Sequence, residues 1–189
     1  RDPNYRATMQ RGLYNVPPGP APVTIVTRPD SLAQNPSSML TKTHFHALAE
    51  ACLFQPGIEA KLAATQTLAD CLLDGRLDYS ARPLAVRPAT AVIFPERPLL
   101  VEPRQLRRRS LHSAAGRIAF LHAVAHIEFT AIVLAWDMAY RFPGLPEAFY
   151  RDWLQIAVEE ARHFAAVQAR LRSLGAAYGD LPAARGLWE

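Results

Sequence analysis

The fold is decided by residues 116–174, which read GRIAFLHAVAHIEFTAIVLAWDMAYRFPGLPEAFYRDWLQIAVEEARHFAAVQARLRSL. The stretch predicts two long helices joined by the turn FPGLP at residues 142–146, because proline and glycine interrupt helices. At about 100° per residue, Glu128 falls in the middle of an apolar stripe on the first helix. Glu160 and His163 share an apolar stripe on the second helix. The pattern therefore places two acids and an imidazole where little water is expected.

These three side chains need a compensating partner. An ionised carboxylate on an apolar face has to be paired, neutralised or bound to a metal. One glutamate on a helix and a Glu-x-x-His on its neighbour form half of the ligand set of a di-iron or di-manganese four-helix bundle. The i, i+3 spacing sets Glu160 and His163 one turn apart on the same face, so that both can reach one metal pair. The alternative is that arginine or tyrosine satisfies Glu128 and Glu160, with His163 as a core histidine.

The same segment carries a family resemblance. Its motifs are Gly116-Arg117, Phe120-Leu121-His122-Ala123, Ala125-His126-Ile127-Glu128, Ala131-Ile132, Leu134-Ala135, Arg141-Phe142-Pro143-Gly144-Leu145-Pro146, Phe149-Tyr150-Arg151-Asp152-Trp153, Glu159-Glu160-Ala161-Arg162-His163-Phe164 and Tyr178-Gly179-Asp180. Together they resemble the ferritin-like family catalogued as domain of unknown function 455, whose fold is similar to that of the non-haem di-iron tRNA hydroxylases. The resemblance runs from about Leu40 to Glu189 and is most specific from Arg107 onward.

The resemblance implies a helical bundle that binds iron or manganese. Its first-half ligands would be Glu128, Glu160 and His163, and Glu189 would be the next carboxylate, at the start of a third core helix. The second Glu-x-x-His of the family is absent, and residues 182–184 read Pro-Ala-Ala where the family has Pro-Ala-His. One chain is therefore expected to hold an incomplete site, and we assign no catalytic residue. Either the chain is a fragment, or two chains complete one bundle, or the domain has lost its metal.

The whole chain divides into segments by composition. Its 189 residues, half of them hydrophobic, suffice for one domain with a core. We predict an all-α, ferritin-like helical bundle with proline-rich extensions. The predicted segments are a proline-rich extended arm at 1–38, an N-terminal helical pair at 39–78, a proline-rich wrapping linker at 79–112 and an incomplete core helix hairpin at 113–189.

Two further features of the core hairpin can be predicted. Ser110 or Ser113 is expected to cap the first core helix. His122 and His126 share a face that lies well over about 100° from Glu128, so they should not join its metal site. An i, i+4 histidine pair can bind zinc, but these two lack the intervening glutamate of the metalloprotease helix. We expect them to hydrogen-bond the arm or the linker instead.

The cysteines and the longest apolar run bear on the compartment. In an antiparallel helical pair, Cys52 lies near the turn and Cys71 lies several turns away, so we predict two free thiols. This favours an intracellular reducing compartment, either the cytoplasm or an organelle matrix after removal of a targeting segment. Residues 118–136 are about long enough to span a bilayer, but His122 and Glu128 interrupt them. We predict a buried bundle helix and no membrane span.

Three functional hypotheses follow. The first is a ferritin-like metal protein, acting as a di-iron oxidoreductase only where a partner chain or a C-terminal half completes the site. The second is a truncated, non-catalytic accessory subunit of a larger assembly. The third is an RNA-binding accessory that uses the basic triplet at residues 107–109, although a formal charge of +4 and the lack of interleaved aromatics argue against nucleic acid. For the first two we expect a homodimer or a larger assembly through the apolar face of the core helices.

Overall fold

Four helices make up most of the structure, a computed structural model that describes residues 42–80, 85–107 and 109–188. The prediction of an all-α fold is confirmed, and the described residues belong to one compact unit, Met39–Glu189. The predicted arm at 1–38 lies outside the described residues. The helices are α2 (Phe45–Leu53), α3 (Ile58–Leu73), α4 (Ala114–Arg141) and α5 (Glu147–Ser173).

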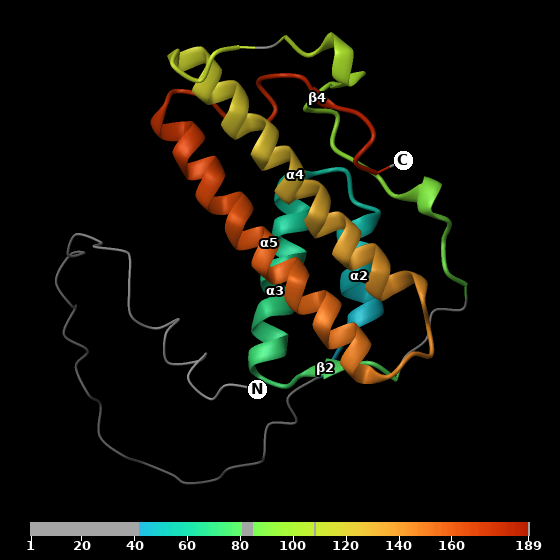
Figure 1. The fold of residues 1–189 in the computed structure, drawn as a ribbon. Helices are drawn as coiled ribbons and strands as arrows, with labels where there is room; N and C mark the ends of the chain where they lie inside the picture. The colour runs from blue at the N-terminus through green and yellow to red at the C-terminus, as the bar shows by residue number, and fades with distance from the viewer. Residues whose placement is uncertain (1–41, 81–84, 108, 189) are drawn as a thin grey trace, which may run out of the picture. The chain divides into compact units, whose positions relative to one another are not determined.

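The long helices α4 and α5 form an antiparallel hairpin, and α2 and α3 pack behind it (Figure 1). Of the two predicted caps, Ser110 and Ser113, it is Ser113 that caps α4. Its hydroxyl accepts a hydrogen bond from the Gly116 amide over 3.0 Å. Gly116 is required there, since a Cβ atom would lie 1.8 Å from the carbonyl oxygen of Ser110. The predicted turn between the helices contains Gly144 at φ 88°, a conformation that favours glycine.

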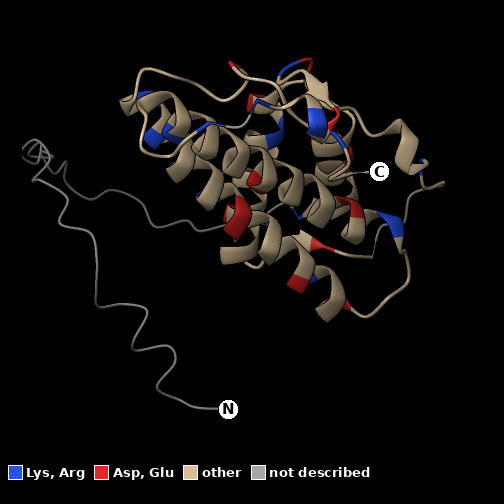
Figure 2. Cartoon of the chain, turned by 45° about the horizontal axis from the view of Figure 1, so that its top comes forward, with Lys and Arg blue, Asp and Glu red and all other residues tan. Residues whose placement is uncertain are grey.

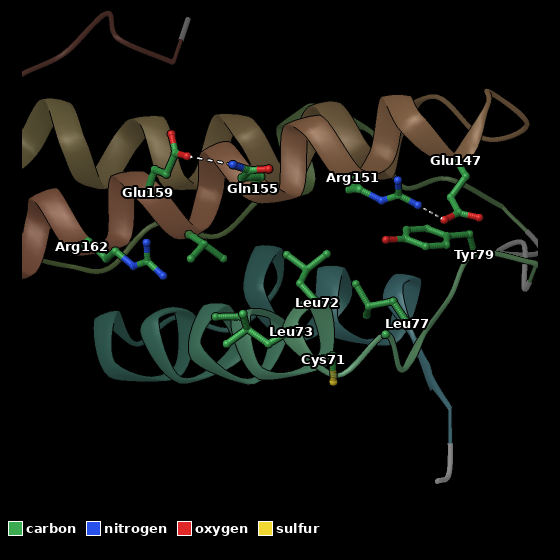
Figure 3. Close-up of a pocket in the computed structure, with 13 residues that line it drawn as sticks. Cys71, Leu72, Leu73, Leu77, Tyr79, Glu147, Arg151, Gln155, Glu159 and Arg162 are labelled. Carbon is green, nitrogen blue, oxygen red and sulfur yellow. Dashed lines mark hydrogen bonds and ion pairs between the residues drawn. The ribbon is translucent and has the colours of Figure 1, made fainter. Parts of the chain in front are cut away.

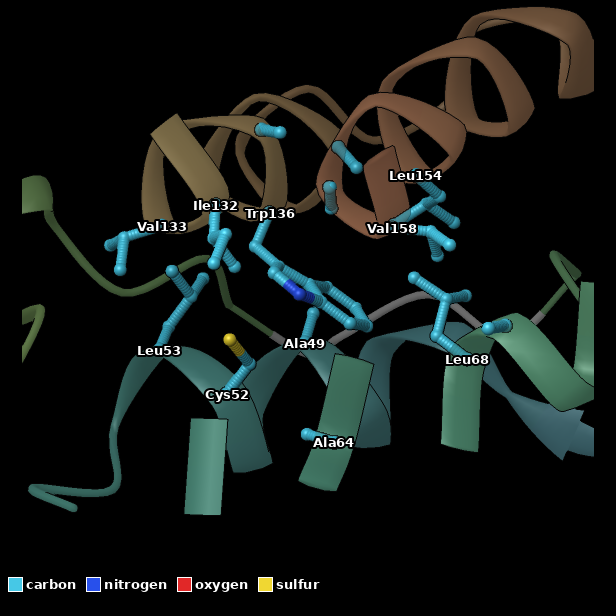
Figure 4. Close-up of a cluster of buried hydrophobic side chains, with 14 of the residues drawn as sticks. Ala49, Cys52, Leu53, Ala64, Leu68, Ile132, Val133, Trp136, Leu154 and Val158 are labelled. Atoms are coloured by element: carbon cyan, nitrogen blue, oxygen red, sulfur yellow. The ribbon is translucent and has the colours of Figure 1, made fainter. Parts of the chain in front are cut away.

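The core lies between the hairpin and the N-terminal helical pair (Figure 4). Trp136 of α4 is fully buried, and its indole N–H donates to the Thr65 hydroxyl over 2.9 Å. This hydrogen bond satisfies the one polar atom of a side chain that otherwise contributes apolar surface. The buried apolar side chains around it include Ala49, Cys52, Leu53, Ala64, Leu68, Ile132, Val133, Leu154 and Val158.

Lys61, in the first turn of α3, is completely buried. Apolar periodicity alone does not predict that a lysine is buried there. Its ammonium group donates hydrogen bonds to the carbonyl oxygens of Cys52 and Leu53, at the C-terminal end of α2. The partial negative charge at that helix end compensates the buried cation. Burial lowers the pKa of Lys61 and raises the pKa of the neighbouring Cys52 thiol to about 12. Cys52 and Cys71 are both free, as predicted.

Two short pairs of parallel strands fasten the connecting segments. β1 (Thr43–His44) pairs with β2 (Leu77–Asp78), and β3 (Leu100–Val101) pairs with β4 (Ala183–Ala184). Two 3₁₀ turns, η1 (Ala89–Ala91) and η2 (Pro103–Gln105), lie in the proline-rich linker. The linker and the segment after α5 therefore run side by side, with β4 in contact with α4 (Figure 1).

By length and composition, α4 is apolar enough to cross a membrane. In the structure 44% of its most apolar window is buried inside the protein, and α4 packs against α5, α2 and β4. The helix thus packs within the bundle along one side and leaves Phe120, Ile127 and Leu134 exposed on another.

Candidate metal centre

Glu128, Glu160 and His163 converge on the solvent-facing side of the α4–α5 hairpin. Glu128 comes from the middle of α4, and the other two come from consecutive turns of α5. One potential ligand atom from each residue lies within 4.8 Å of the other two. The Nδ1 atom of His163 is 3.1 Å from Oε2 of Glu160 and 3.7 Å from Oε2 of Glu128. The helical periodicity therefore identified three side chains that do meet.

The three groups are more accessible to water than the sequence predicted. The side chains of Glu128 and Glu160 are 21% and 24% exposed, and that of His163 is 60% exposed. The prediction of a dry seam is thus wrong for His163. The reason is that α2 and α3 cover the other side of the hairpin, and no described segment packs over this one.

The two carboxylates interact directly. Burial, together with the hydrogen bond and the charge of Glu160, raises the pKa of Glu128. The hydrogen bond from Glu128, with further help from His163, lowers the pKa of Glu160. A single proton held between the two carboxylates accounts for both directions. A cation bound between the two carboxylates would compete with that proton.

The alternative partners foreseen from the sequence are not there. Within the described residues, neither Glu128 nor Glu160 accepts a hydrogen bond from an arginine or a tyrosine, and the one basic side chain within ion-pair distance of them is His163. His163 is exposed, so it is not a core histidine either. Glu189, the fourth predicted ligand, lies outside the described residues.

His122 and His126 stay apart from this centre, as predicted, but their rings do not hydrogen-bond the described part of the linker. The His122 Nε2 atom accepts hydrogen bonds from the backbone amides of Gly179 and Leu181, over 3.0 and 3.4 Å. The His126 ring lies between the Tyr178 hydroxyl at 2.9 Å and the Ala184 carbonyl oxygen at 3.2 Å. Among the described residues, both histidines therefore bind the segment after α5 rather than the linker, and the arm lies outside the described residues.

The partners of His126 also fix its protonation. A carbonyl oxygen can only accept, so the Nε2 atom of His126 carries the hydrogen and Nδ1 accepts from Tyr178. Burial lowers the pKa of both histidines, which keeps the rings neutral. In the sequence, the motif Tyr178-Gly179-Asp180 marks the segment that binds the two histidines. Its residue pattern does not indicate that His122 and His126 are its partners.

The charges of the described surface are mixed in sign. Figure 2 shows lysine and arginine interspersed with aspartate and glutamate over the helices and loops. Arg107 and Arg109, the described members of the basic triplet, are exposed.

Comparisons with known proteins extend the observations from this chain. A family model described as "Protein of unknown function (DUF455)" matches residues 54–189. A curated protein of Haemophilus influenzae (strain ATCC 51907 / DSM 11121 / KW20 / Rd), described as "Uncharacterized protein", is 48% identical over 103 residues. The matched part covers 51% of this chain and 36% of that relative, so the chain spans about a third of the relative's length. No solved structure matches.

Proposed function

This chain belongs to the DUF455 family, and we propose that it is a ferritin-like metal-binding protein of the di-iron or di-manganese type. The observation that carries the proposal is the convergence of Glu128, Glu160 and His163, whose ligand atoms lie within 4.8 Å of one another. All three residues fall inside the segment that matches the family.

The donor set suits the proposed ions. Carboxylate and imidazole ligands are those of non-haem iron and manganese proteins. Two glutamates that approach each other without an arginine between them also favour a divalent cation, because the cation removes their repulsion. Bound iron or manganese would supply the redox chemistry for oxygen-dependent oxidation or hydroxylation. Glu128 of α4 and Glu160 and His163 of α5 would hold the ion from two helices.

The proposed site is half of a bundle site. A complete one takes a glutamate from each of two helices and a Glu-x-x-His from each of two others, and the described residues supply one of each. Enzymatic activity therefore requires ligands from a partner chain or from a further segment of a longer protein. The greater length of the Haemophilus relative is compatible with the second source.

An exposed apolar stripe on α4 supports assembly with another chain. Phe120, Ile127 and Leu134 recur every seven residues on α4 and are 54%, 52% and 44% exposed. Residues seven apart lie on one side of a helix, and a continuous apolar side is suited to packing against another helix. At about 100° per residue the stripe lies roughly a quarter to a third of a turn round α4 from Glu128, and Phe120 and Ile127 line a groove with Leu106 and Leu181. A partner that covers the stripe would therefore have to reach round α4 to add ligands to the centre. A homodimer or a larger assembly would meet this requirement.

The same stripe favours a second candidate, a non-catalytic ferritin-like accessory subunit that uses this surface for docking and has lost its metal. Both candidates fit a reducing compartment, since the two cysteines are buried and unpaired. Bound metal distinguishes the metal-binding protein from the accessory subunit.

The test is to load the purified chain with Fe²⁺ or Mn²⁺ and to measure bound metal by mass spectrometry after desalting. The wild-type protein is expected to retain metal, whereas Glu128→Ala, Glu160→Ala and His163→Ala are expected to lose it. Glu159→Ala is the matched control, because Glu159 is exposed on the same helix and outside the cluster. A metal-free wild-type protein, or a Glu160→Ala protein with full metal content, would leave only the accessory subunit.

A further inference from the structure

A cleft lies between α3 and α5, and the α5 residues that line it include Glu159 and Arg162 but not Glu160 or His163. It consists of two adjoining cavities of about 530 and 390 Å³. Both cavities are lined by Ala69, Leu73, Val158 and Arg162, so they adjoin, and together they are here called the α3–α5 cleft. Each cavity has the volume of a typical small-molecule site.

One wall of the α3–α5 cleft is apolar. Leu72 and Leu73, at the end of α3, and Leu77 of β2 lie across the cleft from α5 (Figure 3). Leu73 is 82% exposed, the highest value among the large hydrophobic side chains of the described residues. An apolar side chain so exposed contributes little to the core, but it offers contact area to a molecule in the cleft.

The opposite rim is charged, and its groups differ in how well they are paired. Arg151 forms an ion pair with Glu147, and the Gln155 amide donates to the Glu159 carboxylate over 3.1 Å. Arg162 forms no ion pair or hydrogen bond with any described residue, although it lines both cavities. The cleft therefore combines an apolar wall with one guanidinium group that has all its donors available.

We propose that the α3–α5 cleft binds an amphiphilic monoanion, an alkyl chain that ends in a carboxylate. The carboxylate pairs with Arg162, whose planar fork matches two carboxylate oxygens. The alkyl chain lies along Leu72 and Leu73. Glu159, one turn before Arg162 on the same rim, repels a second negative charge, which favours a carboxylate over a doubly charged phosphate. This inference does not depend on the proposed metal centre.

The experiment titrates the full chain with decanoate below its micelle-forming range, followed by calorimetry and by NMR. The expected result is saturable binding of one decanoate per chain. Arg162→Gln is expected to weaken binding about tenfold, the loss of one charge-assisted hydrogen-bonded pair. Leu73→Gln, which removes apolar wall, is also expected to weaken it. Both side chains are exposed, so neither change should affect folding, which thermal unfolding checks.

Matched controls test the location and the chemistry. Arg172→Gln and Leu99→Gln change exposed residues outside both cavities and are expected to leave binding unchanged. Decanol and decylamine are expected to bind at least tenfold more weakly than decanoate. The proposal is overturned if decanoate binding does not saturate, or if Arg162→Gln binds decanoate as tightly as the wild type does. It is also overturned if decyl phosphate binds more tightly than decanoate, or if the protein binds anionic lipid vesicles but not decanoate.

Discussion

The indole N–H of Trp136 donates to the Thr65 hydroxyl over 2.9 Å, and this hydrogen bond joins α4 to α3 inside the core. Thr65→Val keeps the shape of the side chain but leaves the buried N–H without an acceptor. We expect a loss of about 1–3 kcal/mol in the free energy of unfolding, measured by urea denaturation. Thr67→Val is the control, because Thr67 is exposed and its change should stay within about 0.5 kcal/mol. Equal effects for the two variants would contradict the role given to this hydrogen bond.

The contact between His122 and the segment after α5 should make stability depend on pH. His122 must be neutral at Nε2 to accept from the amides of Gly179 and Leu181, and burial lowers its pKa in the folded protein. The unfolded chain therefore binds more protons below about pH 6.5, so stability is full above that pH and is lost as the pH falls. The slope from one such group reaches at most about 1.4 kcal/mol per pH unit.

His122→Asn should lower stability at pH 7 and reduce the slope of stability between pH 7 and pH 5. His112→Asn, a change in an exposed histidine, should keep the wild-type slope. Denaturant unfolding at several pH values measures both quantities. An unchanged slope in His122→Asn would show that another group is responsible.

The proposed metal centre predicts stabilisation by its ion. A metal that binds only the folded state adds about 2.7 kcal/mol at a hundredfold excess over its Kd, so Mn²⁺ should raise the Tm of the wild-type protein. Glu160→Gln should abolish the rise, whereas the exposed Glu159→Gln should preserve it. Thermal scans with and without Mn²⁺ provide the measurement. A rise of the same size in Glu160→Gln would place the ion elsewhere.

The apolar stripe of Phe120, Ile127 and Leu134 predicts self-association. Ile127→Asp or Leu134→Asp would bring a charge into the contact between two chains. Either variant should therefore lower the apparent molecular mass in sedimentation equilibrium toward that of a single chain. Leu73→Asp is the control, because Leu73 is highly exposed but lies away from α4. A wild-type protein that sediments as one chain at all concentrations would contradict homodimer formation through this stripe.

The parts of the fold that local pattern determines were predictable from the sequence. The two core helices follow from apolar periodicity, their turn follows from Pro143 and Gly144, and the start of α4 follows from Ser113. The meeting of Glu128 with Glu160 was also predictable, because the stripe of each helix fixed the direction of its side chain.

The remaining features depend on what packs over each face, and periodicity does not contain this information. It marked the face that carries His163 as apolar, but it could not tell that no described segment covers that face. It separated His122 from the metal centre without showing that residues after α5 would bind it. Lys61 was not foreseen in the core, because a lysine is buried only where tertiary structure supplies acceptors.

The buried ammonium group of Lys61 sets the length of the connection at residues 54–57. Loops at a protein surface usually tolerate inserted residues. Here an insertion would move the carbonyl oxygens of Cys52 and Leu53 away from the nitrogen atom that binds them and leave a positive charge without acceptors inside the protein. This short turn is therefore constrained from within, and evolution can change its residue types more freely than their number.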